Sequence, residues 1–169
     1  MRPDDLDEVM VIEREAFRHP WSPELFRREL EHDWSTILVG VEPLTPFALP
    51  SGYGPSSAKP PPPAAGKGSE RIVAFLIFWL VHDEVHILNV AVAPEHRRKG
   101  IARILMAECE KRAHQANAAL MTLEVRRSNQ GALDLYREFD YRAVGVRPNY
   151  YVDEGEDAIV MVKELKRET

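Results

Sequence analysis

The start of the chain shows two helical patterns followed by a strand pattern. Apolar side chains at helical spacing, with acidic residues early, predict an amphipathic helix over residues 4–17. A second helix is expected after the segment HPWS (19–22), with Ser22 as N-cap and Pro23 at the first helical position. The β-branched, apolar run STILVGV (35–41) predicts a strand.

Two longer apolar runs predict strands at the centre of a sheet. Residues 72–81 and 85–93 are almost continuously apolar and are separated by His-Asp-Glu, which favours a hairpin. The second run is apolar on both alternations, apart from His86 and Asn89. A strand that is apolar on both sides needs cover on both faces, so we expect this one in the middle of the sheet.

The second half of the chain alternates helix and strand. Residues 100–115 carry apolar side chains at every fourth position and predict a helix, and residues 119–125 predict the next strand. A helix capped by Ser128 is expected next, and two strands, 141–146 and 158–165, close the chain. This order of elements predicts an α/β fold of the α+β type, in which helices cover the faces of a mixed sheet.

A proline-rich segment interrupts the pattern at residues 43–69. It holds eight of the 13 prolines and four of the nine glycines, and no hydrophobic period survives in it. We expect an extended, flexible insertion within a single domain spanning residues 1–169, because neither flank is large enough to form a core alone. Its run of four prolines also suits the aromatic groove of a partner, whereas a tolerated surface insertion is the simpler interpretation.

Composition and charge narrow the function classes. The chain has 169 residues, 44% of them hydrophobic and 29% charged, with a net charge of -5 and a pI near 5.7. Because nucleic-acid binders usually carry a basic surface, we expect no direct nucleic-acid partner. No apolar run reaches the roughly 20 residues that span a bilayer, and no signal peptide is recognisable. The single cysteine, Cys109, fits a reducing compartment, so we expect a cytoplasmic protein without membrane contact.

Candidate chemistry begins at the segment VAVAPEHRRKGIARIL (90–105). Arg97, Arg98 and Lys99 precede Gly100 and a helix start, where the backbone already repels cations and attracts anions. Free N–H groups of the loop and the first helical turn can bind phosphate oxygens there. The Lys-Ser/Thr ending of a P-loop is missing, which argues against magnesium-dependent phosphoryl transfer. A solvated basic turn is the alternative.

The segment RRKGIA resembles the pyrophosphate loop of the GNAT superfamily of acyl-CoA-dependent N-acyltransferases, through Arg97, Gly100 and Ala102. Further segments resemble the bacterial RimI branch of that superfamily: HPWS (19–22), DEVHILNVAV (83–92), LEVRRSNQGALDLY (123–136) and RPNYY (147–151). That branch acetylates the N-terminal alanine of protein eighteen of the small ribosomal subunit. The resemblance covers nearly the whole chain outside residues 43–69 and implies the GNAT fold.

The resemblance implies that acetyl-CoA is the acetyl donor and lies between the two central strands. Backbone groups of Val90, Ala91 and Val92 would bind its pantetheine arm as an added strand would. The pyrophosphate would lie on the basic loop and the helix start: Arg97, Arg98, Lys99, Gly100, Ile101 and Ala102. Asn129 would contact the cofactor arm, unless it is a second capping residue beside Ser128. No cluster of metal ligands is seen in the sequence, and no metal is expected.

Two residues take catalytic roles under this resemblance. Glu124, at the end of a predicted strand, becomes the general base, directly or through a water; from the sequence alone it would be a carboxylate in solvent. Tyr136 becomes the acid that serves the departing CoA thiolate, or else a packed aromatic. Because a phenol is a weaker acid than a thiol, a hydrogen bond to the sulfur is the larger expected effect. His86 and Glu84 are alternates for the base.

Aromatic side chains are expected to form the acceptor site. Trp21, Tyr150 and Tyr151 would wall the channel that admits the acceptor peptide, and core packing is a rival role for Trp21. Glu84 is placed with this acceptor group as well. With this resemblance we expect a monomer that acetylates the α-amine of an N-terminal alanine, that of protein eighteen of the small ribosomal subunit or of another protein acceptor, by direct transfer in a ternary complex. A lysine or small-molecule amine acetyltransferase and a non-catalytic CoA-binding subunit are the alternatives.

Two departures from the family pattern concern element ends. The family's first strand, which usually precedes the first helix, is nearly absent, since the chain opens at MRPDD. Asp140 and Tyr141 stand where the family tends to have Gly-Phe after the last helix. Because Asp adopts the left-handed conformation of a helix C-cap less readily than Gly does, this difference bears on local stability.

Overall fold

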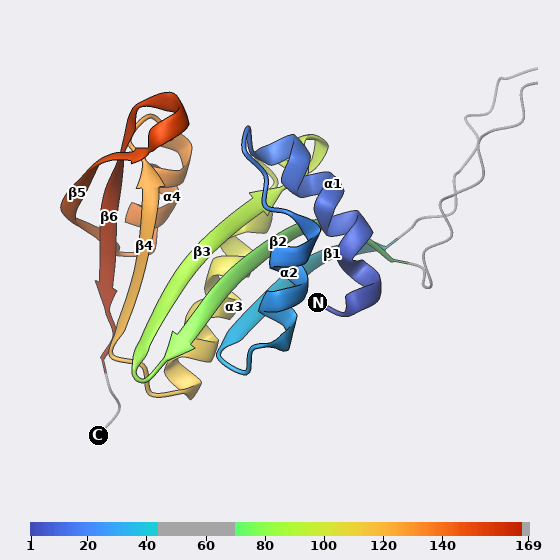
Figure 1. Ribbon diagram of the computed structural model, residues 1–169. Helices are drawn as coiled ribbons and strands as arrows, with labels where there is room; N and C mark the ends of the chain where they lie inside the picture. Colours follow the sequence, from blue (N-terminus) through green and yellow to red (C-terminus); the bar gives the residue numbers. More distant parts are fainter. Residues whose placement is uncertain (44–69, 167–169) are drawn as a thin grey trace, which may run out of the picture.

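The computed structural model describes residues 1–43 and 70–166 (Figure 1). The proline-rich insertion expected at 43–69 lies outside these residues, apart from Pro43. The helices are α1 (Leu6–Ala16), α2 (Pro23–Glu31), α3 (Ile101–Gln115) and α4 (Gln130–Glu138), with the 3-10 turns η1 (Pro3–Asp5), η2 (Pro94–His96) and η3 (Val152–Glu154). The strands are β1 (Ser35–Pro43), β2 (Glu70–Val81), β3 (Glu84–Val92), β4 (Leu120–Arg126), β5 (Arg142–Tyr151) and β6 (Glu156–Glu164).

The six strands form one mixed sheet in the order β1-β2-β3-β4-β6-β5. β3 and β4 run parallel, and every other neighbouring pair is antiparallel. The order of elements is the one that the hydrophobic pattern predicts, and β3 lies inside the sheet as expected. The predicted fold class, a mixed sheet with helices on its faces, is confirmed.

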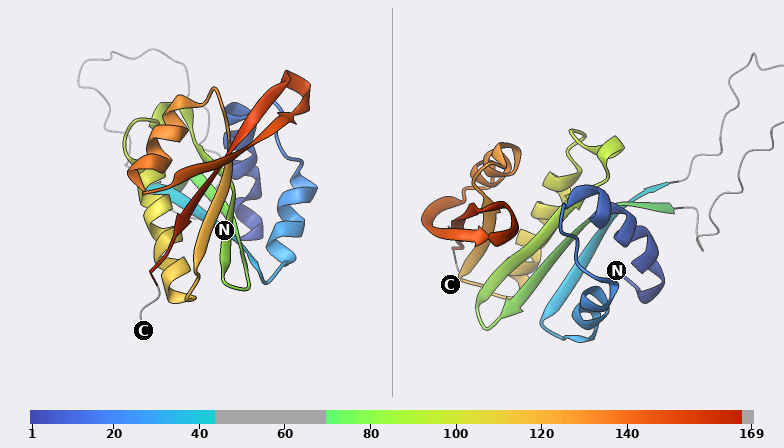
Figure 2. Two further views of the ribbon diagram at one scale, coloured as in Figure 1. Left: turned by 90° about the vertical axis from the view of Figure 1, so that its left-hand side faces the viewer. Right: turned by 45° about the horizontal axis from the view of Figure 1, so that its top comes forward.

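Helices cover both faces of the half of the sheet that holds β1, β2 and β3. In Figures 1 and 2, α1 and α2 lie on one face and α3 lies on the other. Val9, Phe26 and Phe75 belong to the core cluster under α1 and α2, whereas Leu76 and Met106 belong to the cluster under α3. Because successive residues of a strand point to opposite faces, the covered part of β2, from Ile72 onward, needs apolar side chains at every position. Each fully buried side chain of this kind contributes about 1.5–3 kcal/mol to folding.

β3 and β4 separate halfway along their length. Their register ends at the pair formed by Ile87 and Leu123. On its other side β3 stays paired with β2 as far as Val92, with Leu88 as an extra residue in the ladder. Figure 1 shows β4 leaving β3 in company with β5 and β6. Beyond Ile87, therefore, no strand among the described residues pairs with the edges of β3 and β4 that face each other.

Helix α4 begins after Asn129. The side-chain oxygen of Asn129 accepts a hydrogen bond from the N–H of Ala132 at 3.2 Å, which makes Asn129 the N-cap. The predicted cap, Ser128, is wrong by one residue. Its side chain and its backbone N–H, the latter at 2.7 Å, are both hydrogen-bonded to the carboxylate of Glu156 instead. The cap consumes only the oxygen of the Asn129 amide, so its NH₂ group is left for other contacts.

The corner after α4 contains the departure from the family pattern. Asp140 has a φ of +63°, the left-handed conformation in which Gly is the usual residue. Tyr141 follows it into the core, where its hydroxyl is buried without a hydrogen-bond partner in the described part of the chain. A strained backbone position and an unpaired polar group thus occur side by side at this corner.

Candidate active site

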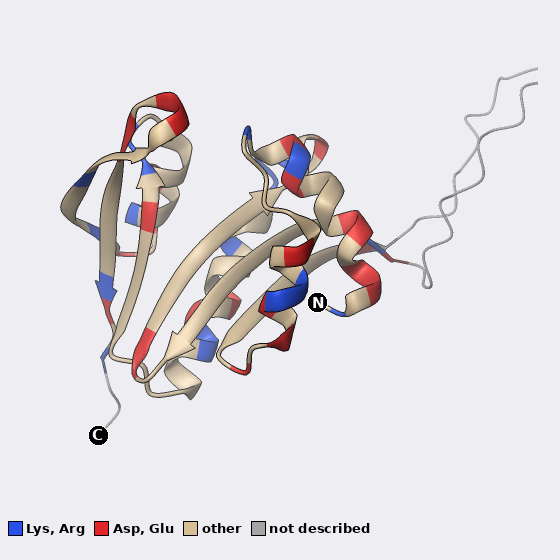
Figure 3. Ribbon diagram, viewed as in Figure 1, with Lys and Arg blue, Asp and Glu red and all other residues tan. Residues whose placement is uncertain are grey.

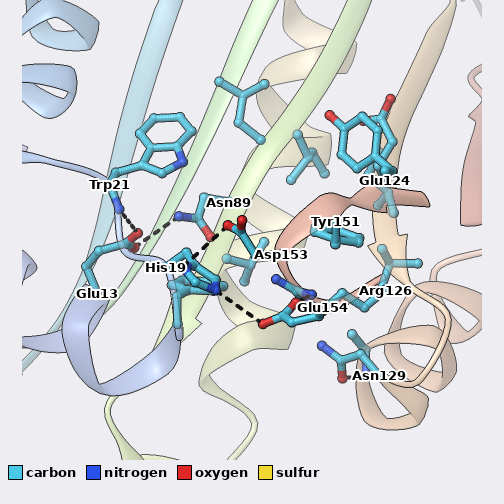
Figure 4. A pocket seen from close by; sticks show the side chains of 18 of the residues that line it. Glu13, His19, Trp21, Asn89, Glu124, Arg126, Asn129, Tyr151, Asp153 and Glu154 are labelled. Atoms are coloured by element: carbon cyan, nitrogen blue, oxygen red, sulfur yellow. Dashed lines mark hydrogen bonds and ion pairs between the residues drawn. The ribbon is translucent and has the colours of Figure 1, made fainter. Parts of the chain in front are cut away.

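A cavity of about 440 Å³ lies where β3 and β4 separate (Figure 4). Side chains from α1, the α1–α2 loop, β3, β4, α4 and the end of β5 with η3 line it. Several residues that the sequence analysis assigns to catalysis, cofactor or acceptor lie on its wall: Trp21, Val90, Glu124, Asn129, Tyr136, Tyr150 and Tyr151. The fold therefore gathers most of the predicted catalytic and acceptor residues at one place.

Glu124 is the first residue of β4 beyond the last pair with β3, so its side chain lies where the strands separate. Strand alternation sets its direction, because Leu123 and Val125 on either side are buried whereas the Glu124 side chain is 28% exposed. Its Oε1 lies 3.1 Å from Nη2 of Arg147 on β5. The carboxylate is thus held at the cavity wall by an ion pair.

Tyr136 reaches the same cavity from α4 and is buried. Its ring lies 5.9 Å from that of Tyr141, centroid to centroid. Burial raises the pKa of Tyr136 well above its ordinary value of 10.0. The phenol therefore stays protonated at neutral pH and can act as a hydrogen-bond donor.

Aromatic side chains form two walls of the cavity. Trp21, in the α1–α2 loop, packs against Phe26 with ring centroids 5.8 Å apart, so it serves both the core and the wall. Tyr150 and Tyr151, at the end of β5, contact each other edge to face at 5.2 Å. The guanidinium of Arg126 lies 3.8 Å from the centre of the Tyr151 ring, which fixes that ring against β4.

The two walls also approach each other through charged groups. His19 of the α1–α2 loop lies 3.6 Å from Asp153 and 3.7 Å from Glu154 of η3. Arg126 pairs with Glu154 as well, and Figure 3 shows how acidic positions gather at the tip of the β5–β6 hairpin. An acidic rim attracts a cationic acceptor such as an ammonium group.

Several polar cavity residues, among them Glu13, Asn89 and Arg126, have no role in the sequence-based predictions. Glu13 is completely buried, and its oxygens accept hydrogen bonds from the N–H of Trp21 at 2.8 Å and from the side chain of Asn89 at 3.0 Å. Burial raises the pKa of Glu13 above its ordinary value of 4.5, against the opposing effect of these two hydrogen bonds. A signal for Glu13 existed in the sequence, since this carboxylate falls on the apolar face of the first helix.

The predicted pyrophosphate loop follows β3 by way of η2. Arg98 and Gly100 have φ values of +62° and +81°, so two left-handed residues turn the chain before α3 begins. Nothing lies within 4 Å of a Cβ placed on Gly100, so its backbone conformation rather than crowding favours glycine. Arg97 donates from Nε to the carbonyl of Val92 at 3.0 Å and ties the loop to the end of β3. The first N–H groups of α3 remain available for an anion.

Some predicted residues lie away from the first cavity. Lys99 and Ile101 border a second cavity, of about 880 Å³, between β1 and α3. Glu84 begins β3 at the opposite end from the site, where its carboxylate lies 3.2 Å from His86. Glu84 and His86 do not line the first cavity. The geometry of that cavity therefore does not support either residue as the general base, or Glu84 as a contact of the acceptor.

No three His, Cys, Asp or Glu side chains within 1–43 and 70–166 gather as metal ligands would. In the same part of the chain no helix is long and apolar enough to cross a membrane. Cys109 is buried, and burial raises its pKa to about 12, which leaves the thiol unreactive.

The profile of the Acetyltransferase (GNAT) family matches residues 6–141, a stretch that includes Glu124, Tyr136 and the basic loop. The chain belongs to the GNAT acetyltransferase family. It is therefore an N-acetyltransferase, and the GNAT family uses acetyl-CoA.

Relatives of this GNAT chain carry more specific names. A Bacillus subtilis protein, named as a candidate ribosomal protein bS18-alanine N-acetyltransferase, is 30% identical over 162 residues, which cover 95% of this chain and 90% of that relative. The Escherichia coli ribosomal protein bS18-alanine N-acetyltransferase is 37% identical over 93 residues, which cover 54% of this chain and 63% of the relative. The crystal structure of the E. coli ribosomal-protein-S18-alanine N-acetyltransferase matches with a TM-score of 0.73 at 26% identity, over 100% of this chain and 93% of that one.

Proposed function

We propose that this GNAT enzyme acetylates the α-amine of a protein N-terminus, and that an N-terminal alanine, that of ribosomal protein bS18, is its acceptor. The observation that carries the proposal is the cavity at the divergence of β3 and β4, which Glu124 and Tyr136 both border. An acceptor entering between the Trp21 wall and the Tyr150 wall would meet these two groups together. The names of the relatives support the choice of acceptor.

The residues present fit acetyl-CoA. Beyond Ile87, no strand among the described residues pairs with β3 on the side that faces β4. The backbone groups of β3 that point to that side, apart from the Val92 carbonyl that Arg97 binds, are available to the amides of a pantetheine arm. Arg97 to Ala102 would hold the pyrophosphate with N–H groups and side-chain charge. Asn129, whose amide NH₂ is not used by the cap, would donate to the arm from the start of α4.

In this mechanism acetyl-CoA supplies an activated acetyl thioester. The side chains accept a proton from the acceptor and donate a hydrogen bond to the leaving group. Glu124 takes a proton from the acceptor ammonium, directly or through a water, and frees the nitrogen lone pair for attack on the thioester carbonyl. The new C–N amide bond forms as the C–S bond breaks, the nitrogen's second proton passes to solvent, and CoA leaves as a thiolate that takes a proton from water. Tyr136 donates a hydrogen bond to the sulfur as negative charge develops there, which stabilises the transition state electrostatically.

The pKa of the acceptor favours an α-amine over a lysine. An α-amino group has a pKa of about 8, so roughly a tenth is neutral at pH 7, whereas a lysine side chain near 10.4 is neutral in about one molecule in 2,500. One carboxylate at a strand edge is a modest base and suits the more acidic ammonium. Lysine would need a site that lowers its pKa substantially.

The test is acetyl transfer to a matched peptide pair. One peptide has a free N-terminal alanine and no lysine, and the other has a blocked N-terminus and one lysine. We expect the blocked peptide to react at least about a hundredfold more slowly, and among free peptides the bS18 N-terminus to react fastest. Faster modification of the lysine peptide would refute the α-amine proposal while leaving the family and its use of acetyl-CoA unaffected.

A further inference from the structure

We propose that Glu13 is a positioning residue for the acceptor, because its buried carboxylate holds Trp21 and Asn89 on one side of the cavity. This inference rests on the proposed function, in that it assumes an amine acceptor enters between the two walls. Glu13 itself touches neither reacting group in this mechanism. Its effect passes through the two residues that it binds.

The geometry joins three segments that are distant in the sequence. Glu13 lies on α1, Trp21 in the loop before α2, and Asn89 on β3 next to the extra residue Leu88. One oxygen of Glu13 accepts from the N–H of Trp21 at 2.8 Å, and the other accepts from the amide of Asn89 at 3.0 Å. Figure 4 shows Glu13 and Trp21 on one side of the cavity and Glu124 on the other.

Both residues that Glu13 binds need such an anchor. Residues 17–22 form neither helix nor strand, so little besides side-chain contacts fixes where Trp21 stands in the wall. Asn89 is the first residue of β3 after the irregularity, just where β4 is no longer a neighbour. Because both line the cavity, a shift of either would change the space left for the acceptor.

Burying a carboxylate costs folding free energy, so Glu13 needs an explanation. A purely structural role can be tested against a functional one by comparing Glu13 with a second buried carboxylate. No cation among the described residues pairs with Glu13, and burial raises its pKa. The chain offers a matched control in Glu29 on α2, which is also buried. Glu29 accepts hydrogen bonds from the hydroxyl of Ser35 and, at 2.7 Å, from the indole N–H of Trp79. It joins α2 to β1 and β2 in the same way but does not line the active cavity.

The experiment compares wild type, Glu13→Ala, Glu13→Gln, Asn89→Ala and Glu29→Ala in steady-state kinetics, well below the lowest melting temperature. The acceptor is the amine that wild type uses best in a panel of free N-terminal peptides, a lysine peptide and small amines.

We expect Glu13→Ala to raise the acceptor KM about tenfold or more and to leave the KM for acetyl-CoA unchanged. Glu13→Gln should recover most of this loss, because its amide oxygen can accept from Trp21 while its NH₂ donates to a flipped Asn89 amide. Glu29→Ala should lower the melting temperature and leave both KM values unchanged.

Several outcomes would overturn the proposal. Equal kinetic effects in Glu13→Ala and Glu29→Ala, or an unchanged acceptor KM in Glu13→Ala, would reduce Glu13 to a structural residue. A Glu13→Gln enzyme as defective as Glu13→Ala would mean that the charge matters rather than the hydrogen bonds. If Glu13→Ala does not fold, Asn89→Ala decides, since it removes one of the two bonds and should raise the acceptor KM by a smaller factor. The ranking of amines in the panel tests the proposed function separately, because the variants are compared on whichever amine wild type prefers.

Discussion

Nη2 of Arg147 lies 3.1 Å from Oε1 of Glu124, so a cation from β5 holds the candidate general base. The pair spans β6, which lies between β4 and β5 in the sheet. An acceptor ammonium brings the same charge to the same carboxylate. The mechanism therefore depends on Glu124 accepting a second partner on the side that faces the cavity.

Replacing Glu124 by Gln should lower kcat by about 10²- to 10⁴-fold, because the amide cannot accept a proton from the acceptor. Binding of CoA, measured by calorimetry, should change little, since Glu124 contacts the acceptor side. Glu84→Gln is the matched control, because Glu84 pairs with His86 at the other end of β3. A large loss of kcat in Glu84→Gln and none in Glu124→Gln would reverse the assignment of the base.

Replacing Tyr136 by Phe should lower kcat by about ten- to a thousandfold with little change in the KM for acetyl-CoA. The reason is that its hydroxyl, whose pKa burial raises, donates a hydrogen bond that strengthens as charge develops on the sulfur. Steady-state kinetics at saturating acceptor measure this directly. A raised KM with normal kcat would instead assign Tyr136 to packing.

Tyr141→Phe should stabilise the protein by about 1 kcal/mol, because it removes a buried hydroxyl that has no partner in the described part of the chain. Urea unfolding of the variant and wild type measures the difference. The same variant is the control for Tyr136→Phe, since the two rings are neighbours. Loss of stability would indicate that the hydroxyl finds a partner, such as a bound water.

Gly100→Asp should weaken CoA binding about tenfold or more, because it places a carboxylate at the start of α3, where the pyrophosphate is proposed to lie. Gly100→Asn is the comparison, since Asn matches Asp in size and in its tolerance of a φ of +81° but lacks the charge. Calorimetric titration of both variants with CoA separates strain from repulsion. Unchanged affinity in Gly100→Asp would move the phosphate site elsewhere.

Glu13 should make stability depend on pH in a defined direction. Its pKa is raised in the folded protein above the ordinary value of 4.5, so the folded state binds more protons than the unfolded state between those two pKa values. The free energy of unfolding must then fall as pH rises through that window. Glu13→Gln has no titrating group at this position. In urea unfolding at several pH values, the free energy of unfolding of the variant relative to wild type should therefore increase as pH rises. A constant difference across the window would contradict the raised pKa.

Hydrophobic patterning was sufficient to predict the order of helices and strands. From Ile72 onward β2 is apolar at every position because helices cover both of its faces, and such a run is distinctive in a sequence. Glu124 could be placed on the face opposite Leu123 and Val125 because strand alternation is strict. Periodicity does not decide between Ser128 and Asn129 as N-cap, since both residue types can cap and the contacts of each with its neighbours determine which one does.

Contacts between distant segments were not predictable from periodicity. Glu84 and Glu124 are both strand carboxylates, and only the register of β3 against β4 shows that they lie at opposite ends. Glu13 is visible in the sequence as a carboxylate on an apolar face. Its partners, however, are 8 and 76 residues away, and they are identified by the packing of α1 against β3.

The divergence of β3 and β4 also means that ligand binding should change the hydrogen exchange and the stability of the sheet. A molecule that fills the space between them would act as a missing strand and would protect backbone amides that otherwise exchange with solvent. Hydrogen exchange of the N–H groups between Leu88 and Val92 that point toward β4 should therefore slow when CoA binds. At a ligand concentration a hundred times Kd the folded state gains about 2.7 kcal/mol, so the melting temperature of this enzyme should report how much CoA is bound.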